Sequence, residues 1–160
     1  DLEILSLRGN VGTRVARVRP GDLDAAVMAV AGLKRLDMGD GISEVLEPPE
    51  FLPAPAQGAL AVEVRTDRSE VQEAVGLIDD ADARATTAAE RAFLQSLRAG
   101  CNAPVAALAT LNRSELTLVA AVFEHDASRP EIGVAQLEDA DALGRTVAAR
   151  VLAARVPEDQ

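Results

Sequence analysis

The clearest candidates for chemistry near the start of the chain are four arginines, Arg8, Arg14, Arg17 and Arg19. No acidic side chain lies between residues 4 and 21 to neutralise them. Guanidinium groups bind carboxylates and phosphates through paired hydrogen bonds, so the cluster could hold an anion. A run of like charges is also commonly the solvated face of a helix, and the spacing alone does not decide between the two.

The only cysteine, Cys101, lies on a predicted loop between Gly100 and Pro104. It could be buried and inert, because free cysteine is among the most buried residue types. It could be a nucleophile, but this chemistry needs a base, and the only histidine is His125, on another predicted loop. A lone loop cysteine can also hold a cofactor covalently, with no second catalytic group beside it.

Composition excludes several classes of function. With 48% apolar and 26% charged residues, the chain has the balance of a soluble globular protein. One cysteine and one histidine exclude an internal disulfide and a metal site built mainly from these ligands. The net charge of −10, with no Trp or Tyr, argues against nucleic-acid binding. No membrane-length apolar run or signal-peptide pattern occurs, so we expect a cytoplasmic protein with no membrane partner.

The sequence around these arginines predicts an α/β unit that would position them. Strands are predicted over 2–7 and 24–30, with a short helix to about residue 19 between them and a helical turn over 32–37. Such a unit favours a parallel sheet, whose ligands gather at the carboxyl ends of its strands. Two strands cannot cover themselves, and the chain starts without an initiator Met, so we expect a fragment with an incomplete first domain.

The rest of the chain predicts a crossing segment and a small α+β domain. Four prolines between residues 47 and 56 indicate the crossing, and a strand is predicted over 58–65. Helices are then predicted over 68–77, 82–98 and 140–156, with an antiparallel meander of strands over 105–110, 115–123 and 131–137. The predicted domains are 1–50, part of an α/β domain; 51–66, a crossing with a strand; and 67–160, an α+β domain.

Five motifs occur in one order along nearly the whole chain. They are Arg8-Gly9-Asn10-Val11-x-Thr13-Arg14, Ala29-Val30-Ala31-Gly32-Leu33-Lys34-Arg35-Leu36, Leu52-Pro53-Ala54-x-x-Gln57-Gly58-Ala59-Leu60, Ala89-Glu90-Arg91-Ala92-Phe93-Leu94 and Gly100-Cys101-x-x-Pro104. In order and spacing the set resembles the porphobilinogen deaminase (hydroxymethylbilane synthase) family.

The resemblance implies a transferase that links four porphobilinogen molecules into hydroxymethylbilane and releases ammonia at each addition, in the biosynthesis of haem and other tetrapyrroles. It also implies one covalent dipyrromethane cofactor per chain, held by a thioether to Cys101. The implied fold is a periplasmic-binding-protein-like α/β domain with a parallel or mixed sheet, followed by a cofactor-anchoring α+β domain with a three-stranded antiparallel sheet.

Residue roles follow from the same resemblance. Because each pyrrole ring has an acetate and a propionate group, a growing chain needs cationic partners. The family's carboxylate-binding arginines match Arg8, Arg14 and Arg35, while Arg17 and Arg19 match no motif position. The implied supporting residues are Asn10 and Thr13, which would orient the loop or donate to a carboxylate, and Gln57 and Gly58, which match the interdomain crossing. Glu90 and Arg91 are expected to form a packing and salt-bridge pair.

Two departures from the family pattern stand out. Ala99-Gly100-Cys101 replaces a common Gly-Gly-Cys, and Ala56 stands where relatives commonly have Gly before the Gln. In the family a first domain with the catalytic aspartate precedes the residue that matches Asp1. We therefore expect no catalytic residue in this chain and no turnover by the chain alone. The implied partners are porphobilinogen, the growing polypyrrole and the missing N-terminal domain of the same protein. The complete protein is expected to be a monomer.

Two other classes of function stay open. One is a non-catalytic anion-binding α/β module that uses the arginine cluster and leaves Cys101 buried. The other is a regulatory or interaction fragment. The deaminase interpretation requires an accessible, covalently modified Cys101, whereas an anion-binding module would tolerate Cys101→Ala and lose affinity on Arg14→Ala.

Overall fold

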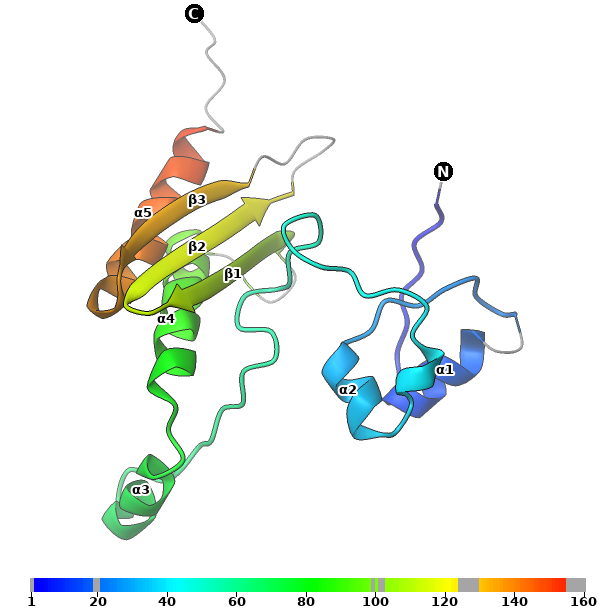
Figure 1. Ribbon diagram of the computed structural model, residues 1–160, viewed down its shortest axis with the longest axis horizontal. Coiled ribbons are helices and arrows are strands. Elements are labelled where there is room, and N and C mark those ends of the chain that lie inside the picture. The colour runs from blue at the N-terminus through cyan, green and yellow to red at the C-terminus, as the bar shows by residue number, and fades with distance from the viewer. Residues whose placement is uncertain (1, 19–20, 99, 101–102, 124–129, 155–160) are drawn as a thin grey trace, which may run out of the picture. The chain divides into compact units, whose positions relative to one another are not determined.

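A computed structural model describes residues 2–18, 21–98, 100, 103–123 and 130–154 (Figure 1). Contacts divide the chain into two units, Asp1–Leu46 and Glu47–Gln160, and each is described by itself. The assignment of residues 1–50, 51–66 and 67–160 to domains of a longer protein stays a prediction.

The first unit contains two short helices. Helix α1 spans Val11–Val18 and α2 spans Val30–Arg35, and a single 3-10 turn, η1, follows at Gly39–Gly41. Both helices confirm the helical segments that the sequence predicts in this region. A Cβ at Gly32 would lie 3.6 Å from the Val11 side chain, so the two helices pack closely at this point.

The strands predicted over 2–7 and 24–30 do not form, and the described part of the first unit contains no strand. Their apolar side chains stay in solvent, with Leu2, Ile4 and Val27 exposed by 84%, 85% and 69%. A strand is stable only beside a hydrogen-bonding neighbour, and these segments have none within the unit. The predicted parallel or mixed sheet is therefore not confirmed by the described residues of this unit.

The second unit is built on a three-stranded antiparallel sheet, as predicted. Its strands are β1 (Val105–Asn112), β2 (Glu115–Val122) and β3 (Glu131–Gln136), in the order β1-β2-β3. The register pairs Ala109 with Leu118, and Leu118 with Gly133. Each strand pairs with the strand that follows it in the sequence, so the sheet is an antiparallel meander.

Three helices accompany the sheet and confirm the predicted helical segments. Helix α3 spans Ser69–Gly76, α4 spans Ala81–Ser96, and α5 spans Ala140–Ala153 after a 3-10 turn, η2, at Leu137–Asp139. Asp80 caps α4, because its Oδ1 accepts the backbone N–H groups of Asp82 and Ala83, both at 3.0 Å.

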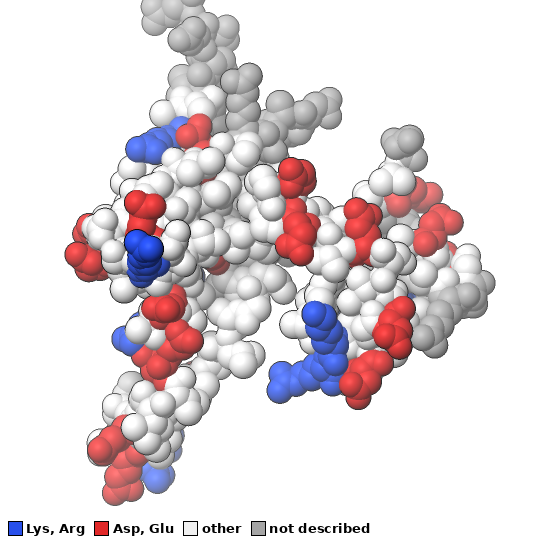
Figure 2. Space-filling model, in the orientation of Figure 1, with Lys and Arg blue, Asp and Glu red and all other residues white. Residues whose placement is uncertain are grey.

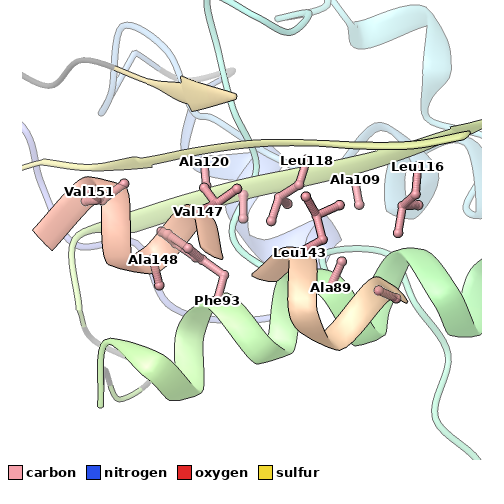
Figure 3. Packing of buried hydrophobic residues seen from close by; sticks show 12 residues of the cluster. Ala89, Phe93, Ala109, Leu116, Leu118, Ala120, Leu143, Val147, Ala148 and Val151 are labelled. Carbon is pink, nitrogen blue, oxygen red and sulfur yellow. The ribbon is translucent and has the colours of Figure 1, made fainter. Parts of the chain in front are cut away.

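The core of the second unit lies between the sheet and helices α4 and α5, which cover one face of it (Figure 1). Figure 3 shows Phe93, Leu118 and Val147 pointing into this layer from α4, β2 and α5. All three side chains are fully buried, and each contributes about 1.5–3 kcal/mol to folding. The cluster consists of Ala89, Phe93, Ala107, Ala109, Leu116, Leu118, Ala120, Ala140, Leu143, Val147, Ala148 and Val151.

The strand predicted over 58–65 does not form either. Leu60 and Val62 in this segment are 88% and 56% exposed. The outer edge of β1 is not free to pair with the segment, because the N–H groups of Ala107 and Ala109 already donate to Pro53 and Glu90. The segment therefore does not pair with β1.

Candidate functional site

The loop before α1 is ordered by its own side chains. Oδ1 of Asn10 accepts the backbone N–H and the hydroxyl of Thr13, both at 2.9 Å, so Asn10 caps the helix. Gly9 has φ 117, a backbone conformation that favours glycine. These contacts orient the loop, whereas a role for Asn10 or Thr13 toward a ligand stays a prediction.

Arg14 is held against this loop. Its Nε donates to the carbonyl oxygen of Gly9 at 2.8 Å, and the residue is half-buried. Within the described part of the chain, no acceptor takes the N–H groups of its two terminal nitrogens. The side chain therefore presents an oriented cationic edge, which suits two-point binding of a carboxylate.

The other arginines of the cluster differ in their surroundings. Nε of Arg17 lies 4.0 Å from Oδ2 of Asp22, and both side chains are exposed, so this ion pair adds little stability. Arg8 is exposed and has no acidic partner among the described residues. Arg19 lies outside the described residues. Figure 2 shows acidic side chains spread over the visible surface of both units. The chain has a net charge of −10, so an arginine without an acidic neighbour differs from most of this surface.

The structure brings together only some of the predicted site residues. Arg8, Asn10, Thr13 and Arg14 lie at the N-terminal end of α1. Arg35 is the exposed last residue of α2, in the same unit. Two further predicted residues, Gln57 and Gly58, lie in the second unit, and Cys101 lies outside the described residues.

Gln57 and Gly58 belong to a tight turn after the proline-rich crossing. The N–H of Gln57 donates to the carbonyl oxygen of Ala54 at 3.0 Å. Gly58 has φ 86, which glycine adopts without strain, but Ala56 has φ 61, which is unfavourable for alanine. The family resemblance implies Gly at the position of Ala56, and the backbone there has a conformation that favours Gly.

Glu90 is a residue whose contacts the sequence interpretation missed. It was expected to pair with Arg91, but its carboxylate accepts the backbone N–H groups of Ala56 and Ala109, and Arg91 is exposed. Glu90 is only 5% exposed, and burial raises its pKa, against a smaller opposing effect of the two hydrogen bonds. An acidic residue within the apolar face of α4, beside Ala89 and Phe93, is the sequence signal that could have indicated this burial.

Two further features are absent from the residues that the structure describes. No group of three or more His, Cys, Asp or Glu side chains there could hold a metal ion. No helix in that part of the chain is both long and apolar enough to cross a membrane.

The N-terminal end of α1 has the chemistry of a carboxylate-binding site. The first turn of α1 contains no acidic residue, and the partial positive charge of a helix N-terminus adds to that of Arg8 and Arg14. Arg8 is exposed and Arg14 is oriented by Gly9, so both can reach a ligand from solvent. A ligand with several carboxylates fits this donor set.

Comparisons with known proteins agree along the chain. Residues 1–73 match the family model "Porphobilinogen deaminase, dipyromethane cofactor binding domain", and residues 84–153 match "Porphobilinogen deaminase, C-terminal domain". The chain is 52% identical over 129 residues to a porphobilinogen deaminase of Corynebacterium diphtheriae, covering 81% of this chain and 44% of the relative. It is 48% identical over 162 residues to that of Mycobacterium tuberculosis, covering 94% and 52%. The chain thus spans about half the length of the curated relatives it matches.

Proposed function

The chain belongs to the porphobilinogen deaminase family, and on this basis we propose that it is the C-terminal half of an enzyme that links four porphobilinogen molecules into hydroxymethylbilane. Ammonia leaves at each addition, and the product enters tetrapyrrole and haem biosynthesis. The observation that carries the proposal is the match of both successive family models, the first of which is a dipyrromethane cofactor-binding domain.

In this proposal, Arg8, Arg14 and Arg35 bind the acetate and propionate groups of the cofactor and of the growing chain. Support comes from the geometry of Arg14, which is anchored through Nε and keeps its terminal nitrogens for a ligand. Asn10 and Thr13 keep the loop in the conformation that presents Arg14. Gln57 and Gly58 line the crossing, where Gly58 provides the positive φ that the turn requires.

Cys101 is the proposed attachment point of the dipyrromethane, through a thioether. When bound, this group supplies the anchor on which the pyrrole chain grows. The protein's own contribution is to hold the carboxylates of the chain while it lengthens. A periplasmic-binding-protein-like arrangement of the first domain, a monomeric state and a cytoplasmic location belong to the same proposal.

The decisive experiment is an intact mass with peptide mapping around Cys101, on protein from cells that make the complete gene product. A mass increment of two linked pyrroles on Cys101, with a pyrrole colour in Ehrlich reagent, is expected. Cys101→Ser should show neither the increment nor the colour. A bare thiol that also fails to load with added hydroxymethylbilane would contradict the proposal and favour the anion-binding module.

The 160-residue chain by itself is proposed to be inactive, because it spans only about half the length of its relatives. Incubation of the purified chain with porphobilinogen should release no ammonia and form no bilane. The complete gene product serves as the positive control in the same assay. Measurable bilane synthesis by the chain alone would show that it contains a sufficient catalytic site.

A further inference from the structure

The outer edge of β1 has backbone N–H groups that point away from β2, among them those of Ala107 and Ala109. Alternate residues of an edge strand direct their N–H groups outward, and such groups are costly if they are buried without an acceptor. Ala107 donates to the carbonyl oxygen of Pro53 at 3.0 Å, and Ala109 donates to Oε1 of Glu90 at 2.7 Å. A carboxylate from α4 therefore occupies a position that a neighbouring strand's carbonyl group would take.

The crossing segment that runs along this edge has few donors of its own. Pro53 and Pro55 lack an N–H group, which leaves the backbone N–H groups of Ala54 and Ala56. Ala56 donates to Oε2 of Glu90 at 2.5 Å. The carboxylate of Glu90 thus joins the crossing segment to β1. Its two donors, Ala56 and Ala109, lie 34 and 19 positions from Glu90 along the chain.

The surroundings of Glu90 contain no competing charge. Residues 53–56 and strand β1 have no ionisable side chain, and the other charged residues of α4 and α5 are exposed, namely Asp82, Arg84, Arg91, Asp141, Arg145 and Arg150. No buried side-chain nitrogen or oxygen of the described residues lacks a hydrogen-bond partner. An ionised carboxylate can accept both N–H groups, whereas an amide has one accepting oxygen and one donating NH₂ group.

We propose that Glu90 is a positioning residue that clamps the crossing segment 53–57 to β1 and so fixes the turn that contains Gln57 and Gly58. Ala56 lies at φ 61, an unfavourable conformation that persists only where surrounding contacts hold it. The clamp goes beyond the proposed reaction, because holding the turn requires neither a cofactor nor turnover.

Amide NMR on the isotope-labelled 160-residue chain tests the clamp. The signals of Ala56 and Ala109 are expected to shift together with pH, about one midpoint that lies above the usual range of a glutamate. The direction follows from burial, which raises the pKa of Glu90. As the pH falls through this midpoint, the protonated carboxyl loses part of its accepting capacity and both amide environments change.

Substitution provides the second arm. Glu90→Gln should abolish the shared titration and speed hydrogen exchange at Ala56 and Ala109 by at least about tenfold, because one N–H would then face an NH₂ group. Glu73→Gln, at an exposed residue of α3, is the matched control and should leave both rates unchanged. The amide of Leu118 in β2 is an internal reference, since β2 pairs with β1 and β3 and lies outside the clamped segment.

Two results would overturn the proposal. One is equal acceleration of exchange at Leu118, Ala56 and throughout α4 in Glu90→Gln, which would mean that the variant only loosens the whole unit. The other is separate titration midpoints for Ala56 and Ala109 in the unaltered chain. This titration needs no variant, so it decides the question even if Glu90→Gln fails to fold.

Discussion

Arg14 and Arg17 lie on the same helix, within one turn of each other, but the structure gives them different neighbours. Arg14 is anchored to the carbonyl oxygen of Gly9, whereas Arg17 lies near the carboxylate of Asp22. Residue spacing alone left both as members of one cluster that could also be a solvated face, and only the family resemblance separated them. Hydrogen bonding now separates a side chain oriented for a ligand from one that already has an acidic neighbour.

Replacing Arg14 should therefore weaken ligand binding more than replacing Arg17. In the complete gene product, Arg14→Ala should reduce loading with hydroxymethylbilane about 10- to 100-fold, the value of one or two charge-assisted hydrogen bonds. Arg17→Ala, the matched control, should change loading less than about twofold because the residue is exposed and paired. Loading is measured by intact mass and Ehrlich colour, and equal effects of the two variants would contradict the assignment of Arg14.

Ala56 is a residue whose backbone conformation is unfavourable for an alanine side chain. Its φ of 61 lies in the left-handed region, which costs alanine about 1–2 kcal/mol relative to glycine. Ala56→Gly should thus stabilise the second unit by about 0.5–1 kcal/mol, after subtraction of the greater freedom of glycine in the unfolded chain. Thermal or urea unfolding measures the change.

Ala54 provides the control for this prediction. It lies in the same segment and is exposed, but its φ is not positive. Ala54→Gly should therefore destabilise the unit slightly, by up to about 1 kcal/mol. A loss of stability in Ala56→Gly would mean that the Cβ of Ala56 contributes packing that outweighs the backbone strain.

At the scale of elements, the contact between α4 and α5 depends on the absence of a side chain at Gly144. A Cβ at this position would collide with the carbonyl oxygen of Ala89 and would lie 2.7 Å from both the Cβ of Ala92 and the backbone nitrogen of Phe93. The small residues on α4 and α5 let the helices approach closely while both cover the sheet. The amphipathic pattern predicted both helices, but not the closeness of this contact.

Gly144→Ala should destabilise the second unit by about 1–3 kcal/mol, because the backbone of α4 cannot move away without disturbing the core. Gly76→Ala in α3 is the matched control, since nothing lies within 4 Å of a Cβ there and its φ is not positive. The control should be neutral or stabilising by up to about 1 kcal/mol. Urea unfolding of both variants compares them directly, and equal stabilities would contradict the tight contact.

For the whole molecule, the main feature is that three segments with apolar side chains remain unpaired. They are 2–7, 24–29 and 58–65, and their exposed members include Leu2, Ile4, Leu5, Val27, Leu60 and Val62. Since the chain spans about half the length of its relatives, we expect the remaining half to provide the strands that pair with at least the first two segments.

Hydrogen exchange measures this completion. In the 160-residue chain the amides of 2–7 and 24–29 should exchange at nearly the rates of an unstructured peptide. In the complete gene product they should be protected at least about a hundredfold, as amides of a central sheet are. The amide of Leu118 in β2 should be protected in both proteins. Unchanged exchange in the longer protein would contradict the expected pairing.

Helices and the meander could be predicted from the sequence because their hydrogen bonds are local or join neighbouring strands. Asp80 caps α4, Asn10 caps α1, and the apolar spacing of α4 and α5 identifies their buried faces, all within a few residues along the chain. The motif set likewise identified the family from residue order alone.

Tertiary structure decided the features that depend on partners far away in sequence. Segment 58–65 reads as a strand, but a strand requires a hydrogen-bonding partner, and two outward N–H groups of β1 already donate to Pro53 and Glu90. The burial of Glu90 and the φ of Ala56 arise where α4, β1 and the crossing segment meet. The Glu90 carboxylate accepts N–H groups from both β1 and the crossing segment, so its hydrogen bonds form only when both are in place. By itself, the sequence determined the local elements and the family, whereas the folded chain decided which edges are paired and which charges are buried.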